Sequence, residues 1–227
     1  MSSSTAERGG PLPVVVLLSG TGTNFSAIAA AARTGQLPID IRAVISDRPA
    51  AGGLERARAL GIHTEAVPPA DYPDRAAHDA ALAARIDAHD PALVILAGYM
   101  RIFVPAFVAH YTDRMLNIHP SLLPAYRGLH THRRALADGA REHGCTVHFV
   151  VDELDGGPLV AQAPVGVHAD DTEDTLAARV HRAEHKLYPT VIGWFTTGRL
   201  RSAAGRVSFD GRPLTAPMRL EGLDACD

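Results

Sequence analysis

The sequence is poor in cysteine, in aromatic residues and in long apolar runs, and each shortage excludes a class of protein. The two cysteines, Cys145 and Cys226, are too few for a disulfide framework, so a reducing compartment such as the cytoplasm is expected. No apolar stretch reaches the roughly 18 residues that a membrane-spanning helix requires. Lysine and arginine form no dense run and the formal net charge is −3, which argues against nucleic acid or a membrane as a partner.

The 227 residues suffice for one well-packed α/β domain and are few for two. Residues 1–13 are rich in Ser, Gly and Pro and are expected to form a disordered leader. Residues 14–198 are expected to form the domain. Residues 199–227 form a tail in which Asp210 and Gly211 predict a hairpin turn. The oligomeric state is left open, with a homodimer among the arrangements that the sequence allows.

Short apolar, β-branched runs alternate with Ala-rich helical segments through the first two thirds of the chain. Expected strands are 14–18, 39–45, 63–67, 93–97 and 114–118, and expected helices are 25–33, 53–60, 74–89, 105–111 and 131–137. Two strands at 145–151 and 159–167, joined by an Asp-Gly-Gly-Pro turn, then suggest an antiparallel pair before a long helix at 172–196. This order predicts an α/β fold with a doubly wound, mainly parallel, Rossmann-like sheet and an antiparallel C-terminal edge. Ligands of such sheets bind beyond the carboxyl ends of the strands.

A small-residue turn, Ser19-Gly20-Thr21-Gly22-Thr23-Asn24, lies between the first strand and the first helix. Glycines let the backbone approach an anion, and the helix N-terminus offers unpaired N–H groups. The turn is not a P-loop, and Phe25 replaces the third glycine of a dinucleotide fingerprint, which disfavours a nicotinamide or flavin cofactor. A tight turn without a ligand is the alternative.

Asn117 and His119 end an expected strand, and Asp155 lies in the Asp-Gly-Gly-Pro turn. An amide that donates to an oxyanion, an imidazole that moves a proton and a carboxylate that tunes the imidazole are what acyl transfer to an amine needs. Taken singly, Asn-x-His at a strand end is usually a turn feature, and an Asp-Gly-Gly turn is often only a hairpin. His130 and His132 invite a metal interpretation, but no familiar ligand spacing accompanies them, so no metal is expected.

The segments Leu116-Asn117-Ile118-His119-Pro120 and Asp152-Glu153-Leu154-Asp155-Gly156 resemble the folate-dependent formyltransferase superfamily. The resemblance extends from about residue 14 to about residue 198 and is strongest to the branch that formylates phosphoribosylglycinamide. It implies that the chain moves the formyl group of 10-formyltetrahydrofolate to that amine in purine synthesis.

The same resemblance implies site residues by position. The catalytic set would be Asn117, His119 and Asp155. Ribonucleotide contacts would come from Gly22, Thr23 and Asn24, and from His181, Arg182, Ala183 and Glu184 near the C-terminal end of the long helix. Folate contacts would come from Arg75, Met100, Arg101, Ile102, Phe103, Asn117, Val151, Asp152, Glu153, Leu154 and Asp155. For Met100 and Phe103, packing in the core is the alternative.

Arg127 departs from the ribonucleotide branch, which commonly has a proline there, and is more like the formyltransferases that act on tRNA. Three features favour the ribonucleotide branch: the small-residue turn after the first strand, the lack of a large C-terminal extension and the lack of an N-terminal regulatory domain. The remaining alternatives are a hydrolase that passes the formyl group to water and a nucleotide-binding module without activity.

Overall fold

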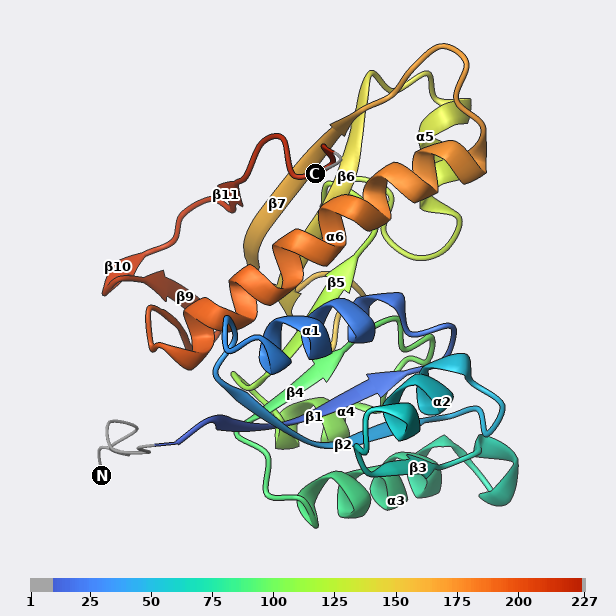
Figure 1. The fold of residues 1–227 in the computed structure, drawn as a ribbon, viewed down its shortest axis with the longest axis vertical. Helices are drawn as coiled ribbons and strands as arrows, with labels where there is room; N and C mark the ends of the chain where they lie inside the picture. Colours follow the sequence, from blue (N-terminus) through green and yellow to red (C-terminus); the bar gives the residue numbers. More distant parts are fainter. Residues whose placement is uncertain (1–9, 226–227) are drawn as a thin grey trace.

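A computed structural model describes residues 10–225 of the chain, which are built around one eight-stranded sheet with the strand order β11-β7-β6-β5-β4-β1-β2-β3 (Figure 1). The strands are β1 (Leu12–Leu18), β2 (Ile39–Ser46), β3 (Thr64–Ala66), β4 (Leu93–Leu96), β5 (Met115–His119), β6 (Glu142–Phe149), β7 (Leu159–Gly166) and β11 (Met218–Arg219). The neighbours from β3 to β5 run parallel, whereas β6 is antiparallel to both β5 and β7. The expected doubly wound sheet with an antiparallel part is therefore confirmed.

Helices cover both faces of the sheet, as the fully apolar strands require. The helices are α1 (Thr23–Arg33), α2 (Gly52–Ala59), α3 (Arg75–Asp87), α4 (Pro105–His110), α5 (Thr131–Ala137) and α6 (Glu173–Thr196), with a short 3-10 helix, η1 (Pro69–Asp71), before α3. Val14 and Val16 of β1 pack in one core with α1, α2 and α6. Val15 and Leu17 pack in the other core with α3 and α4. Alternate residues of a strand thus serve opposite layers.

The helix ends follow from local side chains. The Asp74 carboxylate accepts a hydrogen bond from the backbone N–H of Ala77 at 2.8 Å and so caps α3. Thr172 and Thr175 form a reciprocal cap at the start of α6. Farther along α6, the buried Tyr188 hydroxyl lies 3.0 Å from the carbonyl oxygens of β4 and β5, which fixes the helix across the sheet.

The tail differs from the expectation in detail. β8 (Leu200–Ala203), β9 (Arg206–Phe209) and β10 (Arg212–Pro213) form a separate three-stranded antiparallel sheet, and Asp210 and Gly211 make the expected turn. The next segment, β11, joins the main sheet parallel to β7, which the sequence analysis did not anticipate. β1 begins at Leu12, two residues before the expected start, and residues 1–9 of the expected leader lie outside the described residues. Between residues 10 and 225, no helix is long and apolar enough to cross a membrane.

Candidate active site

The turn after β1 has the close backbone approach that its glycines suggested. Gly22 has φ +77°, a conformation that L side chains rarely adopt. A Cβ atom at this position would lie 2.6 Å from the Cα of Gly53, so the turn and the start of α2 fit together only without side chains. Across the described residues, no side chain caps the first turn of α1, and its leading N–H groups suit an anion.

Asn24 and Glu184 connect this turn to α6. The Asn24 amide donates to Glu184 Oε2 at 2.9 Å, although 160 positions separate the two residues. Glu184 is 3 % exposed, and burial raises its pKa to about 7 even though the Asn24 bond acts in the opposite direction. His181 Nε2 lies 4.0 Å from the same carboxylate oxygen. A hydroxyl-bearing ligand would meet an acceptor here that is half ionised near neutral pH.

The expected ribonucleotide residues on α6 lie in the middle of this helix, so their expected place near its C-terminal end was wrong. His181 and Glu184 are three positions apart and share the helix face that borders the cavity. Ala183 is fully buried in the core, and the Arg182 guanidinium donates to the Asp224 carbonyl oxygen at 3.0 Å. The structure therefore brings His181 and Glu184 to the site but turns Arg182 and Ala183 elsewhere.

Asn117 lies opposite His148 in the antiparallel pairing of β5 with β6. The Asn117 amide donates to His148 Nε2 at 3.1 Å, and His148 Nδ1 therefore carries the hydrogen that bonds to the Phe149 carbonyl oxygen at 3.0 Å. Burial lowers the pKa of His148 to about 4, so the ring is neutral and can accept. This chain of bonds fixes the orientation of the Asn117 amide. The second N–H of that amide is not used in it.

His119, the last residue of β5, is 6 % exposed and lies between two oxygen atoms. Its Nε2 donates to the Tyr126 carbonyl oxygen at 3.0 Å, and its Nδ1 lies 3.4 Å from Asp155 Oδ2. The structure brings Asn117, His119 and Asp155 to one cavity, as the sequence analysis expected.

Residues 120–130, the cover loop, close over this group. The Gly128 N–H donates to Asp155 Oδ2 at 2.9 Å, and the Arg127 guanidinium forms an ion pair with Glu153. Tyr126 has φ +55°, a backbone conformation that costs a non-glycine residue free energy. The cover loop therefore contacts the His119 ring directly through the Tyr126 carbonyl oxygen.

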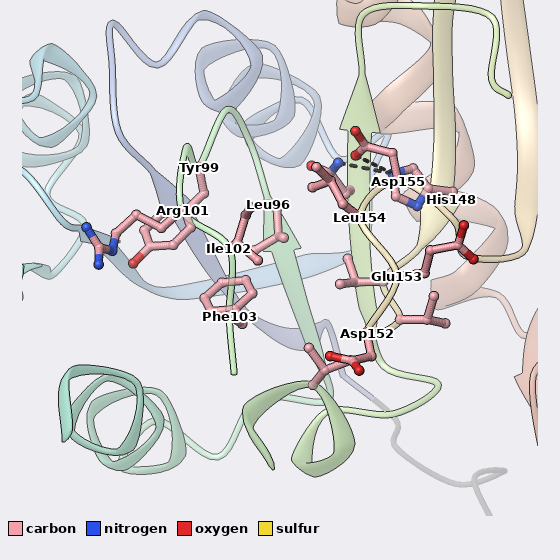
Figure 2. A pocket seen from close by; sticks show the side chains of 14 residues that line it. Leu96, Tyr99, Arg101, Ile102, Phe103, His148, Asp152, Glu153, Leu154 and Asp155 are labelled. Carbon is pink, nitrogen blue, oxygen red and sulfur yellow. Dashed lines mark hydrogen bonds and ion pairs between the residues drawn. The ribbon is translucent and has the colours of Figure 1, made fainter. Parts of the chain in front are cut away.

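Two cavities adjoin one another at this group, and the cover loop borders the larger of them. One, of about 90 Å³, is lined by Leu96, Tyr99, Arg101, Ile102, Phe103, Val108, Asn117, His148, Val150, Val151, Asp152, Glu153, Leu154 and Asp155. The other, of about 340 Å³, is lined by Asn24, Gly98, Tyr99, Met100, Arg101, Ile102, Asn117, Ile118, His119, Pro120, Gly128, Leu129, Leu154, Asp155, His181 and Glu184. Figure 2 shows the segment after β4 and the segment 152–155 facing one another across the smaller cavity.

The larger cavity has an apolar border. Met100, Ile102, Leu129 and Leu154 line it and are about half exposed or more, from 49 % for Leu154 to 64 % for Leu129. Exposed apolar side chains gathered around one opening are typical of a binding site. Phe103 instead stacks between Tyr99 and Phe107 in the core, so for this residue the packing alternative holds as well.

Other expected residues lie apart from these cavities. Arg75 begins α3, is exposed and lines neither cavity. His130 and His132 do not form a ligand set: His132 Nδ1 lies 3.2 Å from the buried His143 Nε2. Burial lowers the pKa of His143 to about 4, so that pair is held as neutral rings.

Comparison with known proteins decides the family. The profile of the Formyl transferase family matches residues 12–192, most of the chain. The chain belongs to this family. The phosphoribosylglycinamide formyltransferase of Escherichia coli strain K12 is 52 % identical over 201 residues, which cover 88 % of this chain and 95 % of that protein.

Solved structures with a similar fold agree with this assignment. The phosphoribosylglycinamide formyltransferase of Coxiella burnetii superposes with a TM-score of 0.89 at 50 % identity, over 92 % of this chain and 99 % of that chain. The formyltetrahydrofolate deformylase of Burkholderia mallei superposes with a TM-score of 0.80 at 26 % identity, over 88 % of this chain and 70 % of that chain.

In this formyl transferase, the sequence analysis missed His148 and the Tyr126 carbonyl. A histidine inside the apolar strand run 145–151 was the available signal for His148, because a polar residue buried in a strand needs a partner nearby. The Tyr126 contact had no signal, since a backbone carbonyl is present at every position.

Proposed function

We propose that this chain transfers the formyl group of 10-formyltetrahydrofolate to the amine of 5′-phosphoribosylglycinamide. The products are N-formylglycinamide ribonucleotide and tetrahydrofolate, a step of purine biosynthesis. The carrying observation is that Asn117, His119 and Asp155 share one cavity with Asn24 and Glu184. Groups suited to acyl transfer thereby lie next to the turn at Asn24, which suits an anion, and next to Glu184, which can accept hydrogen bonds from hydroxyl groups.

The reaction needs a bond made, a bond broken and one proton moved. The amine attacks the formyl carbon, and the carbonyl electron pair moves to oxygen. The Asn117 N–H that His148 does not use donates to this oxyanion, whose stabilisation by one donor is worth about 2.7–4 kcal/mol. The nitrogen of the amine loses a proton, the folate nitrogen gains one, and the bond between the formyl carbon and the folate nitrogen breaks as the carbonyl re-forms.

His119 and Asp155 carry the proton in this proposal. Asp155 Oδ2 faces His119 Nδ1, so the carboxylate stabilises the ring in its doubly protonated state during transfer. A cover loop that releases His119 Nε2 from the Tyr126 carbonyl oxygen would free that nitrogen for a substrate. No metal is needed for any step of this proposal.

The two substrates approach from different sides of the cavity. The flat pterin fits between the segments Met100–Phe103 and Val151–Asp155, where apolar side chains and backbone groups lie together. The phosphate of the ribonucleotide fits the turn at Gly22, Thr23 and Asn24, and Glu184 accepts from the ribose hydroxyls. Arg75, Arg182 and Ala183 stay predictions from resemblance alone.

Folate release from 10-formyltetrahydrofolate, followed by absorbance with and without phosphoribosylglycinamide, tests the proposal. Release that requires the ribonucleotide supports the transferase. Equal release without it would make the chain a hydrolase, the activity named for the Burkholderia mallei relative. Asn24→Ala should raise the KM of the ribonucleotide more than that of the folate, and an equal effect on both would refute the assignment of the turn.

The same proposal covers partners and location. The partners are small molecules, with neither nucleic acid nor membrane, and the chain acts in the cytoplasm as a monomer or a homodimer. Sedimentation of the purified chain at several concentrations distinguishes the two assemblies.

A further inference from the structure

Two histidines and one glutamate meet far from the candidate active site. His63 precedes β3, Glu65 lies in the middle of β3, and His89 follows the end of α3. Glu65 Oε1 lies 3.2 Å from His63 Nε2 and 2.9 Å from His89 Nε2. The three atoms lie within 4.8 Å of one another. The two rings therefore contact a single carboxylate oxygen, one from the segment before β3 and the other from the segment after α3.

These distances match a transition-metal site. Zinc bonds of about 2.0–2.1 Å to histidine nitrogen and carboxylate oxygen, in a tetrahedron, place neighbouring ligand atoms roughly 3.3 Å apart. The separations of 3.2 and 2.9 Å from Glu65 Oε1 need adjustments of a few tenths of an ångström, and the two histidine nitrogens lie within 4.8 Å of each other. Two imidazoles with one carboxylate form a donor set that suits zinc and its neighbours better than calcium or magnesium.

The surroundings hold the ligands in place. The Arg42 guanidinium donates to the His89 carbonyl oxygen at 2.7 Å, and Arg85 lies 3.8 Å from Glu65 Oε2, the oxygen that faces away from the histidines. Glu65 and His89 keep only 18 % and 19 % of their side chains exposed, whereas His63 is open to solvent. His89 follows the C-terminal end of α3, where the helix dipole favours a cation.

We propose that His63, Glu65 and His89 bind one divalent transition-metal ion, with Zn²⁺ as the ion that this donor set fits best. Three protein ligands leave the fourth tetrahedral position to water. The ion would connect the short edge strand β3 to the end of α3, beyond the hydrogen bond between His78 of α3 and the Val67 carbonyl oxygen. Its role is structural, because His63 and His89 lie at the amino ends of β3 and β4, opposite the catalytic crevice.

Zinc titration of the untagged, chelator-treated chain tests the proposal. Isothermal calorimetry should give one zinc equivalent, and Co²⁺ should bind with the strong visible absorption of a four-coordinate site. At zinc 100-fold above Kd, the Tm should rise by about 5–11 °C, as expected for ligand binding to a folded chain of this size.

Variants locate the ion. Glu65→Gln, which keeps the shape of the side chain, and His89→Ala should each weaken zinc binding at least about tenfold. At the same zinc concentration, the Tm rise should therefore fall to about half of the wild-type rise or less. His110→Ala is the matched control, because His110 pairs with the single carboxylate of Asp87 at 2.8 Å without a second imidazole. Formyl transfer should be unchanged in Glu65→Gln and in chelator.

Wild-type zinc affinity in both Glu65→Gln and His89→Ala would overturn the proposal, since the ion would then lie elsewhere. The absence of zinc binding at millimolar concentration in the wild-type chain would overturn it as well. The control variant tests whether zinc binds at a histidine outside the cluster. A loss of zinc binding in His110→Ala would contradict the assignment.

Discussion

Replacing Glu184 with glutamine should make the protein more stable above neutral pH while weakening its affinity for the ribonucleotide. The carboxyl group is 3 % exposed, and its surroundings are an amide from Asn24, the half-exposed His181 and the buried Tyr188 hydroxyl. None of these supplies a fixed positive charge close by. Burial therefore raises the pKa of Glu184 to about 7.

The sign and size of this stability difference follow from the linkage between proton binding and folding. Below pH 4.5, Glu184 is protonated in both the folded and the unfolded chain. As the pH rises, the unfolded chain releases this proton first, so the free energy of unfolding falls until the folded carboxyl also ionises near pH 7. A pKa rise from 4.5 to about 7 corresponds to a loss of about 3 kcal/mol. Glutamine accepts the Asn24 hydrogen bond without carrying a charge, so the variant should avoid this loss.

Urea unfolding of the wild-type chain and of Glu184→Gln at several pH values from 5 to 8 measures the effect. The variant should be the more stable by less than about 1 kcal/mol at pH 5 and by about 3 kcal/mol at pH 8. Glu173→Gln is the control on the same helix, because Glu173 is 40 % exposed and its change should show no such trend. A difference between Glu184→Gln and wild type that stays constant with pH would refute the reasoning.

Three further predictions concern the turn, the catalytic pair and the cover loop. His119→Ala should lower kcat by about 10²–10⁴-fold with an unchanged circular dichroism spectrum, and a wild-type rate would contradict its role. Gly22→Ala should lower the free energy of unfolding by about 1–3 kcal/mol, since its Cβ would meet the Gly53 backbone at a left-handed φ, and an unchanged urea midpoint would oppose this. Arg127→Ala should change stability by less than about 1 kcal/mol, because the pair with Glu153 is exposed. In stopped-flow experiments, Arg127→Ala should also bind folate faster and with less dependence on salt; identical rates would show that the ion pair does not restrain the loop.

Much of the fold was predictable because the chain marks its elements locally. The run 14–18 is apolar and β-branched between a proline and a glycine-rich turn, and β1 ends where that run ends. Asp74 precedes an Ala-rich segment and does cap α3. β11 was not predictable, because a two-residue strand forms only through its pairing with β7 and has no periodicity of its own.

The candidate active site also has features that the sequence predicts and others that it does not. Asn117 and His119 could be placed at a strand end from the sequence, since the sheet brings the carboxyl ends of its strands to one edge. The contacts from Asn24 to Glu184 and from Asn117 to His148 could not, because they depend on how α6 and β6 dock against distant segments. His63, Glu65 and His89 escaped notice for the same reason: their spacing fits no metal motif until α3 folds back on β3.

The small strand β11 also has a protective effect. β7 would otherwise be the outermost strand of the sheet, with a row of open N–H and C=O groups along an apolar surface, and such an edge recruits strands from other chains. The tail occupies it through Met218 and Arg219, continues with a bond from the Leu220 N–H to the Gln162 carbonyl oxygen, and pairs Arg219 with Glu142. A chain that loses its last residues would therefore keep its catalytic groups but expose an aggregation-prone edge.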